Sequence, residues 1–295
     1  MKILVTGAGG MLGSIFCQKF IDAKHEVCGI DIKSGFAEVD ITKKAAIENF
    51  VKKIKPKITV HTAAYTDVDG CELNPNEAYR INAQGTENIA LACNSAGASL
   101  VYISTDYVFN GNRKGAYKET DKPGPVNIYG KSKLMGEEYI KEISKNFLIV
   151  RSSSLFGKNG RNFVKAILEN ASLPGSLKVV NDQRSCPTYV NDLAEAVINL
   201  ININENGIYH AVNNGACSWY EFAYEILKIS GIKKEILPIK SEENGRVAKR
   251  PKMSVLSCDK YNKATGKPMR HWKEALGEYL SLATKRDSWS LGMKF

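Results

Sequence analysis

A tyrosine and a lysine lie four residues apart, at Tyr129 and Lys133, and this spacing places both side chains on one face of a helix. Tyrosine, with a reference pKa of about 10, carries protons poorly at neutral pH, but a neighbouring ammonium favours its ionised form. The pair alone is equally typical of an exposed helix. Thr105, at the end of an earlier predicted strand, would bring a hydroxyl beside Tyr129. Together the three predict acid–base chemistry on a substrate oxygen, and Lys133 could also bind ribose hydroxyls of a nicotinamide.

Three glycines, Gly7, Gly10 and Gly13, lie directly between a predicted strand and a predicted helix. Glycine permits the tight turn, lets the backbone approach a pyrophosphate and leaves the helix N–H groups facing the phosphates. The spacing predicts a dinucleotide site that continues through Met11 and Leu12. The alternative is a strand-to-helix turn that binds nothing.

Asp31 ends the second predicted strand, 18 residues after Gly13. A carboxylate there accepts hydrogen bonds from a ribose diol and repels a 2′-phosphate, so the sequence favours NADH. Lys33 could offset that repulsion, which leaves NADPH open. Asp40 and Ile41 are placed to meet the adenine edge, although Asp40 fits equally well as an N-terminal helix residue.

Short apolar runs alternate with amphipathic stretches through the first half of the chain. Strands that alternate with helices predict βαβ crossovers, and the strands are apolar on both faces, as buried parallel strands should be. We therefore expect an α/β fold with a doubly wound parallel Rossmann sheet. The expected strands are residues 3–6, 26–31, 58–62, 99–104 and 147–151, and the expected helices are residues 11–24, 42–54, 75–96 and 129–144.

After about residue 152 this regularity breaks, but residues 191–203 predict a helix and residues 207–211 a strand that returns to the main sheet. Ser218 is a predicted N-cap, and residues 271–280 predict a packing helix in which His271 has no catalytic role. Ligands of open α/β sheets bind at the carboxyl ends of the strands, hence between sheet and lobe. The expected division is a Rossmann domain of residues 1–152 plus about 189–214 and a smaller discontinuous α/β substrate lobe of about residues 153–188 plus 215–295.

The composition is that of an ordinary globular protein, with 295 residues, 43% hydrophobic and 24% charged, and a net charge of +10. Disordered, collagen-like and small disulfide-rich classes are excluded. Seven scattered cysteines predict a reduced, cytoplasmic protein without a structural metal. No apolar run approaches the roughly 18–20 residues that span a bilayer, and the first residues predict a strand rather than a signal peptide. The positive charge alone suits nucleic acid, a membrane surface or a small anion equally.

Several strings carry a family resemblance that runs nearly end to end. The most discriminating are STDYVFNG from Ser104 and NIYGKSK from Asn127. The chain resembles the extended short-chain dehydrogenases/reductases, and within them the dTDP-4-dehydrorhamnose reductase family. Epimerases and dehydratases of that superfamily share the Tyr/Lys pair but usually lack the flanking strings. Supporting strings are TAAYTDVD from Thr62, NAQGT from Asn82, NDQ from Asn181, Pro187-Thr188 and Arg250-Pro251.

The resemblance implies reduction of the 4-keto group of dTDP-4-dehydro-L-rhamnose to dTDP-L-rhamnose, with hydride from NADH, or NADPH, and a proton from Tyr129. Thr105 would hydrogen-bond the same oxygen, and Lys133 would hold the ribose and tune Tyr129. Asn82 would support backbone and water. The implied cofactor residues are Gly7, Gly10, Met11, Leu12, Gly13, Asp31, Ile32, Asp40, Ile41, Ala63, Ala64, Tyr65, Asn82, Tyr129 and Lys133. The implied substrate residues are Thr105, Asp106, Val108, Phe109, Asn162, Gln183, Pro187, Thr188 and Arg250, with Lys249 as a further anion contact.

Two positions depart from the family pattern. Family members often have a tryptophan where this chain has Ser154, so an aromatic sugar contact is missing or moved. Some relatives bridge their dimer through a metal held by glutamates, one of them at the position of Ile15. We therefore expect no metal, and the resemblance leaves a homodimer open.

The expected partner is a dTDP-linked 4-keto sugar, with no nucleic acid and no membrane, because no basic arm or groove-reading motif appears. Two alternatives stay open. An epimerase or dehydratase of the superfamily would keep its nicotinamide bound and recycle the hydride. A non-catalytic regulatory subunit would have no chemical need for Thr105, Tyr129 and Lys133.

Overall fold

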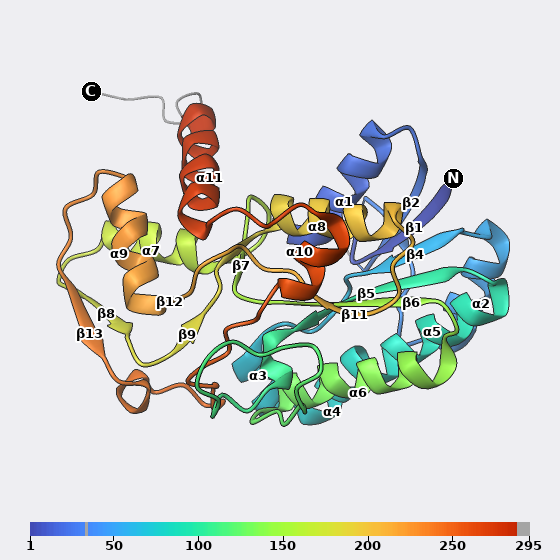
Figure 1. Cartoon of the computed structure of the whole chain (residues 1–295), viewed down its shortest axis with the longest axis horizontal. Coiled ribbons are helices and arrows are strands. Elements are labelled where there is room, and N and C mark those ends of the chain that lie inside the picture. Colours follow the sequence, from blue (N-terminus) through green and yellow to red (C-terminus); the bar gives the residue numbers. More distant parts are fainter. Residues whose placement is uncertain (33–34, 288–295) are drawn as a thin grey trace.

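The structure is a computed structural model that describes residues 1–32 and 35–287, with side chains as far as residue 282. Its centre is a seven-stranded sheet in the order β3-β2-β1-β4-β5-β6-β11 (Figure 1). Every pair of neighbouring strands in it is parallel. The strands are β1 (Lys2–Thr6), β2 (Glu26–Asp31), β3 (Ala37–Glu38), β4 (Ile58–His61), β5 (Ser99–Thr105), β6 (Phe147–Ser152) and β11 (Gly207–His210).

Helices cover both faces of this sheet, which confirms the predicted doubly wound fold (Figure 1). Alternate side chains of a strand point to opposite faces. Ile3 and Val5 therefore pack with one set of helices and Leu4 with the other. The first set is α1 (Met11–Asp22) and α8 (Val190–Asn202); the second is α2 (Lys44–Ile54), α5 (Gly85–Ala96) and α6 (Ile128–Ile143).

The helix predicted over residues 75–96 is interrupted. It consists of α4 (Pro75–Tyr79), a π-helical turn η1 (Arg80–Gln84) and then α5, and it is preceded by the short helix α3 (Val68–Leu73). Single π turns inside α-helices are frequent at functional sites. Here the turn carries Asn82, whose side chain is 1% exposed.

The remaining segments build a smaller lobe at one end of the sheet, on the left of Figure 1. The predicted return of the chain to the main sheet is confirmed, because β11 pairs with β6. Ser218 caps α9 in a reciprocal capping box with Glu221, as its sequence position predicts. The lobe contains α7 (Phe163–Ala171), α9 (Trp219–Ile229), α11 (Trp272–Asp287), η3 (Ser241–Asn244) and the short strands β7 (Leu155–Phe156), β8 (Leu177–Val180), β9 (Arg184–Ser185), β10 (Thr188–Tyr189), β12 (Cys217–Ser218) and β13 (Ile236–Ile239), whereas α10 (Asp259–Thr265) packs against α8 and against β11 of the main sheet.

One hydrophobic core joins the lobe to the sheet, since Phe222 and Trp272 of the lobe belong to the same cluster as Phe16 of α1. The ring of Phe156 lies 5.7 Å from that of Phe222 and 5.5 Å from that of Tyr189. In the described part of the chain, no helix is both long and apolar enough to cross a membrane.

Candidate active site

The glycine turn between β1 and α1 is closely packed. Gly7 has φ +67°, and a Cβ atom on Gly13 would lie 2.1 Å from the carbonyl oxygen of Gly7. The amide of Gly10 donates to that carbonyl at 2.9 Å. Gly10 is the N-cap of α1, and no side chain of the described residues caps this terminus. The glycines let this turn pack closely on itself and on the loop after β4, and the turn leaves a helix N-terminus that suits a phosphate group.

Asp31 lies against this turn at the end of β2, as the sequence predicts. Its Oδ2 accepts a hydrogen bond from the amide of Gly9 at 2.9 Å. The next residue, Ile32, is 77% exposed, and Lys33 lies outside the described residues. Met11 is half-buried, whereas the side chain of Leu12 belongs to the core, so only the backbone of Leu12 can face a cofactor.

Asp40 caps the turn before α2. Its Oδ1 accepts hydrogen bonds from the amide and the hydroxyl of Thr42, at 2.9 and 2.8 Å. Ile41 is buried beneath α5. These contacts favour the helix-entry role of Asp40, and an adenine contact stays a prediction.

Asn82 fixes the loop after β4. Its Oδ1 accepts from the amide of Tyr65 at 2.8 Å, and its Nδ2 donates to the carbonyl of Tyr65 and to Oγ of Ser132, both at 3.0 Å. The amide of Ala63, which is followed by the half-buried Ala64, donates to Oγ1 of Thr6 at 3.3 Å. Asn82 thus ties the predicted cofactor loop to helix α6, as expected of a residue that supports backbone.

Thr105 and Tyr129 meet at the carboxyl edge of the sheet. Thr105 ends β5 and Tyr129 lies in the first turn of α6, and the hydroxyl of Thr105 is near enough to that of Tyr129 to lower its pKa. Asn127 starts this helix by accepting from the amide of Gly130 at 2.8 Å. Burial raises the pKa of Tyr129 more than Thr105 lowers it. The sequence-based expectation was the opposite direction, and desolvation of the ionised form is the physical reason for the difference.

Lys133 lies one helical turn after Tyr129, and its side chain contacts strand β5. Its Nζ donates to the carbonyl of Ile103 at 2.7 Å and lies 4.1 Å from the ring centre of Tyr102. Burial lowers the pKa of Lys133 to about 7, although the carboxylate of Glu137 opposes this shift. The ammonium can therefore lose its proton near neutral pH.

Glu137 is a residue that the sequence patterns did not single out. It is fully buried, and its carboxylate accepts from Nε and Nη2 of Arg151 at 2.9 and 2.6 Å and from the hydroxyl of Ser104 at 2.6 Å. Its position four residues after Lys133, on the same helix face, is the signal that could have found it. The pair fixes α6 against β5 and β6.

Asp106 follows Thr105 and is 2% exposed. Its Oδ1 accepts from the hydroxyl of Thr105 at 3.1 Å and its Oδ2 from that of Ser153 at 2.9 Å. Burial raises the pKa of Asp106 to about 6, and hydrogen bonds from Ser254, Ser153 and Thr105 oppose this rise. Both carboxylate oxygens therefore have partners within the protein.

The side chains of Val108 and Phe109, two of the expected substrate residues, are in the core, so a substrate contact at this turn stays a prediction for its backbone. Both are fully buried, and the ring of Phe109 stacks on that of Tyr117 at 4.1 Å. Only the backbone of the turn η2 (Asp106–Val108) and of Phe109 can approach a ligand.

Other predicted substrate residues have structural partners. Asn162 caps α7 and donates from Nδ2 to the carbonyl of Gly157 at 2.8 Å. Gln183 donates to Oγ of Ser241 at 2.9 Å. Thr188, beside the buried Pro187, is fully buried and donates to the carbonyl of Cys186 at 2.9 Å, so its side chain faces the interior instead of a ligand.

Arg250, an expected anion contact, forms an ion pair with Asp69, and its charge opposes the rise in the pKa of Tyr107 that burial causes. The ring of Tyr107 meets that of Tyr129 edge-on at 5.9 Å. Lys249 is exposed, and its carbonyl accepts from Nδ2 of Asn127 at 2.8 Å. The segment before Pro251 thus contacts the start of helix α6, which carries Tyr129.

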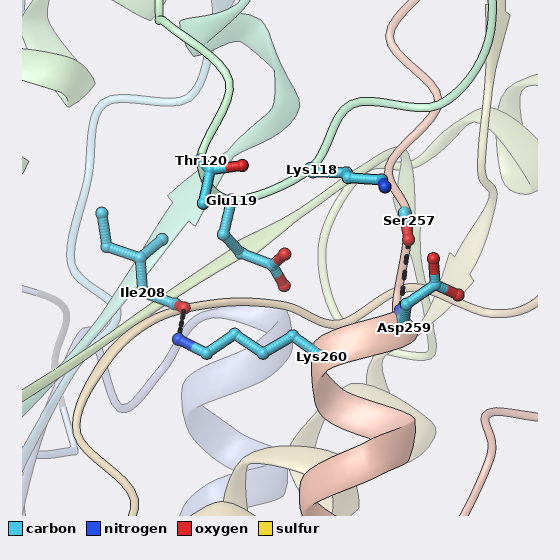
Figure 2. A pocket seen from close by; sticks show the side chains of 7 residues that line it. All are labelled: Lys118, Glu119, Thr120, Ile208, Ser257, Asp259 and Lys260. Atoms are coloured by element: carbon cyan, nitrogen blue, oxygen red, sulfur yellow. Dashed lines mark hydrogen bonds between the residues drawn. The ribbon is translucent and has the colours of Figure 1, made fainter.

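A surface pocket of about 410 Å³ lies beside β11 (Figure 2). Within it, Nζ of Lys260 donates to the carbonyl of Ile208 at 2.7 Å. Its lining residues differ from all the predicted site residues, so it is a separate surface feature. They are Lys118, Glu119, Thr120, Ile208, Ser257, Asp259 and Lys260.

The parallel sheet with its glycine turn, together with the Thr/Tyr/Lys set, defines an extended short-chain dehydrogenase/reductase fold. Within it, the chain belongs to the family described as "RmlD substrate binding domain", whose sequence model matches residues 1–284. This confirms the family resemblance read from the sequence.

Individual relatives agree with this membership. The chain is 44% identical to the spore coat polysaccharide biosynthesis protein SpsK of Bacillus subtilis, over 95% of this chain and 96% of that protein. It is 37% identical to the dTDP-4-dehydrorhamnose reductase of Aggregatibacter actinomycetemcomitans, over 93% of this chain and 97% of that protein. The crystal structure of dTDP-4-dehydrorhamnose reductase from Bacillus anthracis, in complex with NADP, superimposes with a TM-score of 0.90 at 40% identity, over 95% and 98% of the two chains.

Proposed function

We propose that this protein reduces the 4-keto group of dTDP-4-dehydro-L-rhamnose to a hydroxyl, giving dTDP-L-rhamnose, with a reduced nicotinamide cofactor. The observation that carries the proposal is that Thr105, at the end of β5, lies beside Tyr129 at the carboxyl edge of the sheet, one helical turn from Lys133. The family and the reductases among its relatives supply the substrate.

The cofactor would lie on the glycine turn, with its phosphates at the N-terminus of α1 and a ribose near Asp31. When bound, it supplies a hydride. Tyr129 donates its proton to the C4 oxygen of the sugar, and Thr105 hydrogen-bonds the same oxygen, whose charge grows in the transition state. Lys133, when charged, favours the tyrosinate that results. The smaller lobe would hold the nucleotide.

We propose NADH as the preferred cofactor, because a carboxylate at Asp31 repels a 2′-phosphate. The NADP bound by the B. anthracis relative makes NADPH the alternative. The preference is measured as the ratio of kcat/KM for the two cofactors with one sugar substrate.

The function is tested by incubating the purified protein with NADH or NADPH and dTDP-4-dehydro-L-rhamnose, with the UDP-linked sugar as a comparison. We expect one cofactor oxidised for each sugar reduced. Sugar conversion without net oxidation would instead indicate an epimerase or dehydratase. Sugar binding without conversion would indicate a regulatory subunit.

A further inference from the structure

A chain of hydroxyl and carboxyl groups leads from Tyr129 into the protein. The hydroxyl of Thr105 is near enough to that of Tyr129 to lower its pKa, and it donates to Oδ1 of Asp106 at 3.1 Å. The other carboxylate oxygen, Oδ2, accepts from Oγ of Ser153 at 2.9 Å. All three groups beyond the tyrosine are buried. Asp106 thus joins the tyrosine side of the site to the segment after β6.

The chain continues to a residue that is only half-buried. Oγ of Ser153 lies 3.4 Å from Oγ of Ser154, which lies 2.8 Å from Oγ of the buried Ser185. Ser154 is the residue that stands in place of the family's tryptophan, and it has φ +47°, a backbone conformation that residues other than glycine rarely adopt. Among Thr105, Asp106, Ser153 and Ser154, only Ser154 is not fully buried, so the chain comes nearest to solvent there.

The direction of the hydrogen bonds depends on Asp106. When its carboxylate is ionised, it accepts a hydrogen bond from the hydroxyl of Thr105. Oγ1 of Thr105 can then only accept hydrogen bonds from other groups, such as Tyr129 and the amide of Tyr107, which lies at 3.1 Å. When Asp106 is protonated, it can donate to Thr105, whose own proton is then available to Tyr129. Burial raises the pKa of Asp106 to about 6, so both forms are accessible near neutral pH.

We propose that Asp106 and Ser153 form a proton relay that returns a proton to Tyr129 after each turnover, from solvent at Ser154. The relay rests on the proposed function, because Tyr129 must first lose its proton to product. The tyrosinate takes the proton of Thr105, and Thr105 takes that of protonated Asp106. The carboxylate takes the proton of Ser153, which is replaced through Ser154 from water. Each O–H bond broken is matched by one formed; one solvent proton is consumed, and no electrons move.

The test compares Ser153→Ala with Ser152→Ala. Ser152 is a matched control, because its buried hydroxyl donates to the carbonyl of Ala211 at 2.8 Å, outside the relay. Cofactor oxidation is followed with enzyme in excess, where Tyr129 starts protonated, and then in steady state. For Ser153→Ala we expect a single-turnover rate within about twofold of wild type and a steady-state rate about tenfold lower or more, hence a burst of one turnover. Added imidazole, a small proton donor, should restore the steady-state rate, and Ser152→Ala should match wild type in both.

A second variant, Asp106→Asn, removes the titratable group at the centre of the chain and should lower the steady-state rate at least as far as Ser153→Ala does. Equal losses of single-turnover and steady-state rate in Ser153→Ala, or no loss of steady-state rate in either variant, would overturn the relay while the reductase function stands. A wild-type protein that oxidises neither cofactor with the dTDP-sugar overturns the proposed function, and the relay with it.

Discussion

The carboxylate of Asp69 in α3 accepts hydrogen bonds from both terminal nitrogens of Arg250, with Nη1–Oδ1 at 3.0 Å and Nη2–Oδ2 at 2.9 Å. The amide of Ala248 and Nη1 of Arg246 bind the same carboxylate, at 3.0 and 3.1 Å. This ties a helix of the first half of the chain to a segment near its end. Arg250 also lies close enough to Tyr107 to affect the pKa of its phenol, and the ring of Tyr107 meets that of Tyr129 edge-on, so the ion pair lies on the Tyr107 side of Tyr129.

Replacing the acceptor should therefore destabilise the fold. We expect Asp69→Asn to lower the free energy of unfolding at neutral pH by about 1–3 kcal/mol, since it weakens hydrogen bonds to a charged group. Urea denaturation measures the change. Glu77→Gln is the control, because Glu77 pairs with Arg80 at the exposed surface and should change stability by less than about 1 kcal/mol. Equal effects of the two substitutions would contradict a special role for Asp69.

The contribution of the Asp69–Arg250 pair to stability should depend on pH. Burial would raise the pKa of Asp69, but the hydrogen bonds of Arg250 and Ala248 lower it to about 2. A carboxyl whose folded pKa is depressed stabilises the fold above its unfolded pKa and loses that contribution as the pH falls toward the folded value. The stability difference between wild type and Asp69→Asn should thus shrink between about pH 4 and pH 2.

Tyr129→Phe removes the proposed proton donor without changing the ring. We expect turnover to fall by at least about a hundredfold, the scale of general-acid effects, with cofactor affinity nearly unchanged. Steady-state cofactor oxidation and a binding titration measure the two quantities. Tyr139→Phe, on the same helix and also half-buried, is the control and should stay close to wild type. Near-normal turnover in Tyr129→Phe would remove this residue from the mechanism.

Asp31→Ser should relax the choice of cofactor. The carboxylate lies at the glycine turn, where its charge opposes a 2′-phosphate, so its loss should raise the ratio of kcat/KM for NADPH to that for NADH. Glu26→Ser removes a carboxylate at the opposite end of the same strand and should leave the ratio as it is. An unchanged ratio in Asp31→Ser would mean that the side chain is remote from the ribose.

Much of the fold is predictable from the sequence, because a parallel strand buried on both faces must be apolar on both. The second strand begins and ends where predicted, at Glu26 and Asp31. The two-residue strand β3 was missed, since it is too short to show a period. The π turn before Gly85 was missed as well, because hydrophobic spacing does not report which carbonyl each amide binds.

The candidate site was predictable to the level of the sheet edge. Thr105 lies at the end of a predicted strand and Tyr129 at the start of a predicted helix, and both positions bring these residues to the carboxyl edge of the sheet. Side-chain burial was not predictable, as Phe109 shows, because it depends on residues distant in the sequence, such as Tyr117 and His210. The same reason explains why burial, and not Lys133, decides the direction of the pKa shift at Tyr129.

Two buried histidines should make the protein sensitive to mild acid. The ring nitrogens of His61, at the end of β4, lie 2.7 Å from Oγ1 of Thr6 and 3.0 Å from Oγ1 of Thr86. Burial lowers the pKa of His61 to about 3, helped by the charge of Lys133, and burial and Arg151 lower that of His210 to about 3. Both rings are therefore neutral in the folded protein under conditions in which the unfolded chain protonates its histidines.

A base whose folded pKa is depressed binds fewer protons in the folded than in the unfolded state, so stability falls as the pH drops through the window between the two values. That window runs from about pH 6.5 down to about pH 3, with a slope of up to about 1.4 kcal/mol per pH unit for each histidine. We expect His61→Gln, whose amide can still bond a threonine, to remove close to one histidine's share of the slope between about pH 6 and pH 4. Urea denaturation of the wild type and the variant at several pH values measures this slope. A slope in His61→Gln as steep as in wild type would show that acid destabilisation arises at other groups.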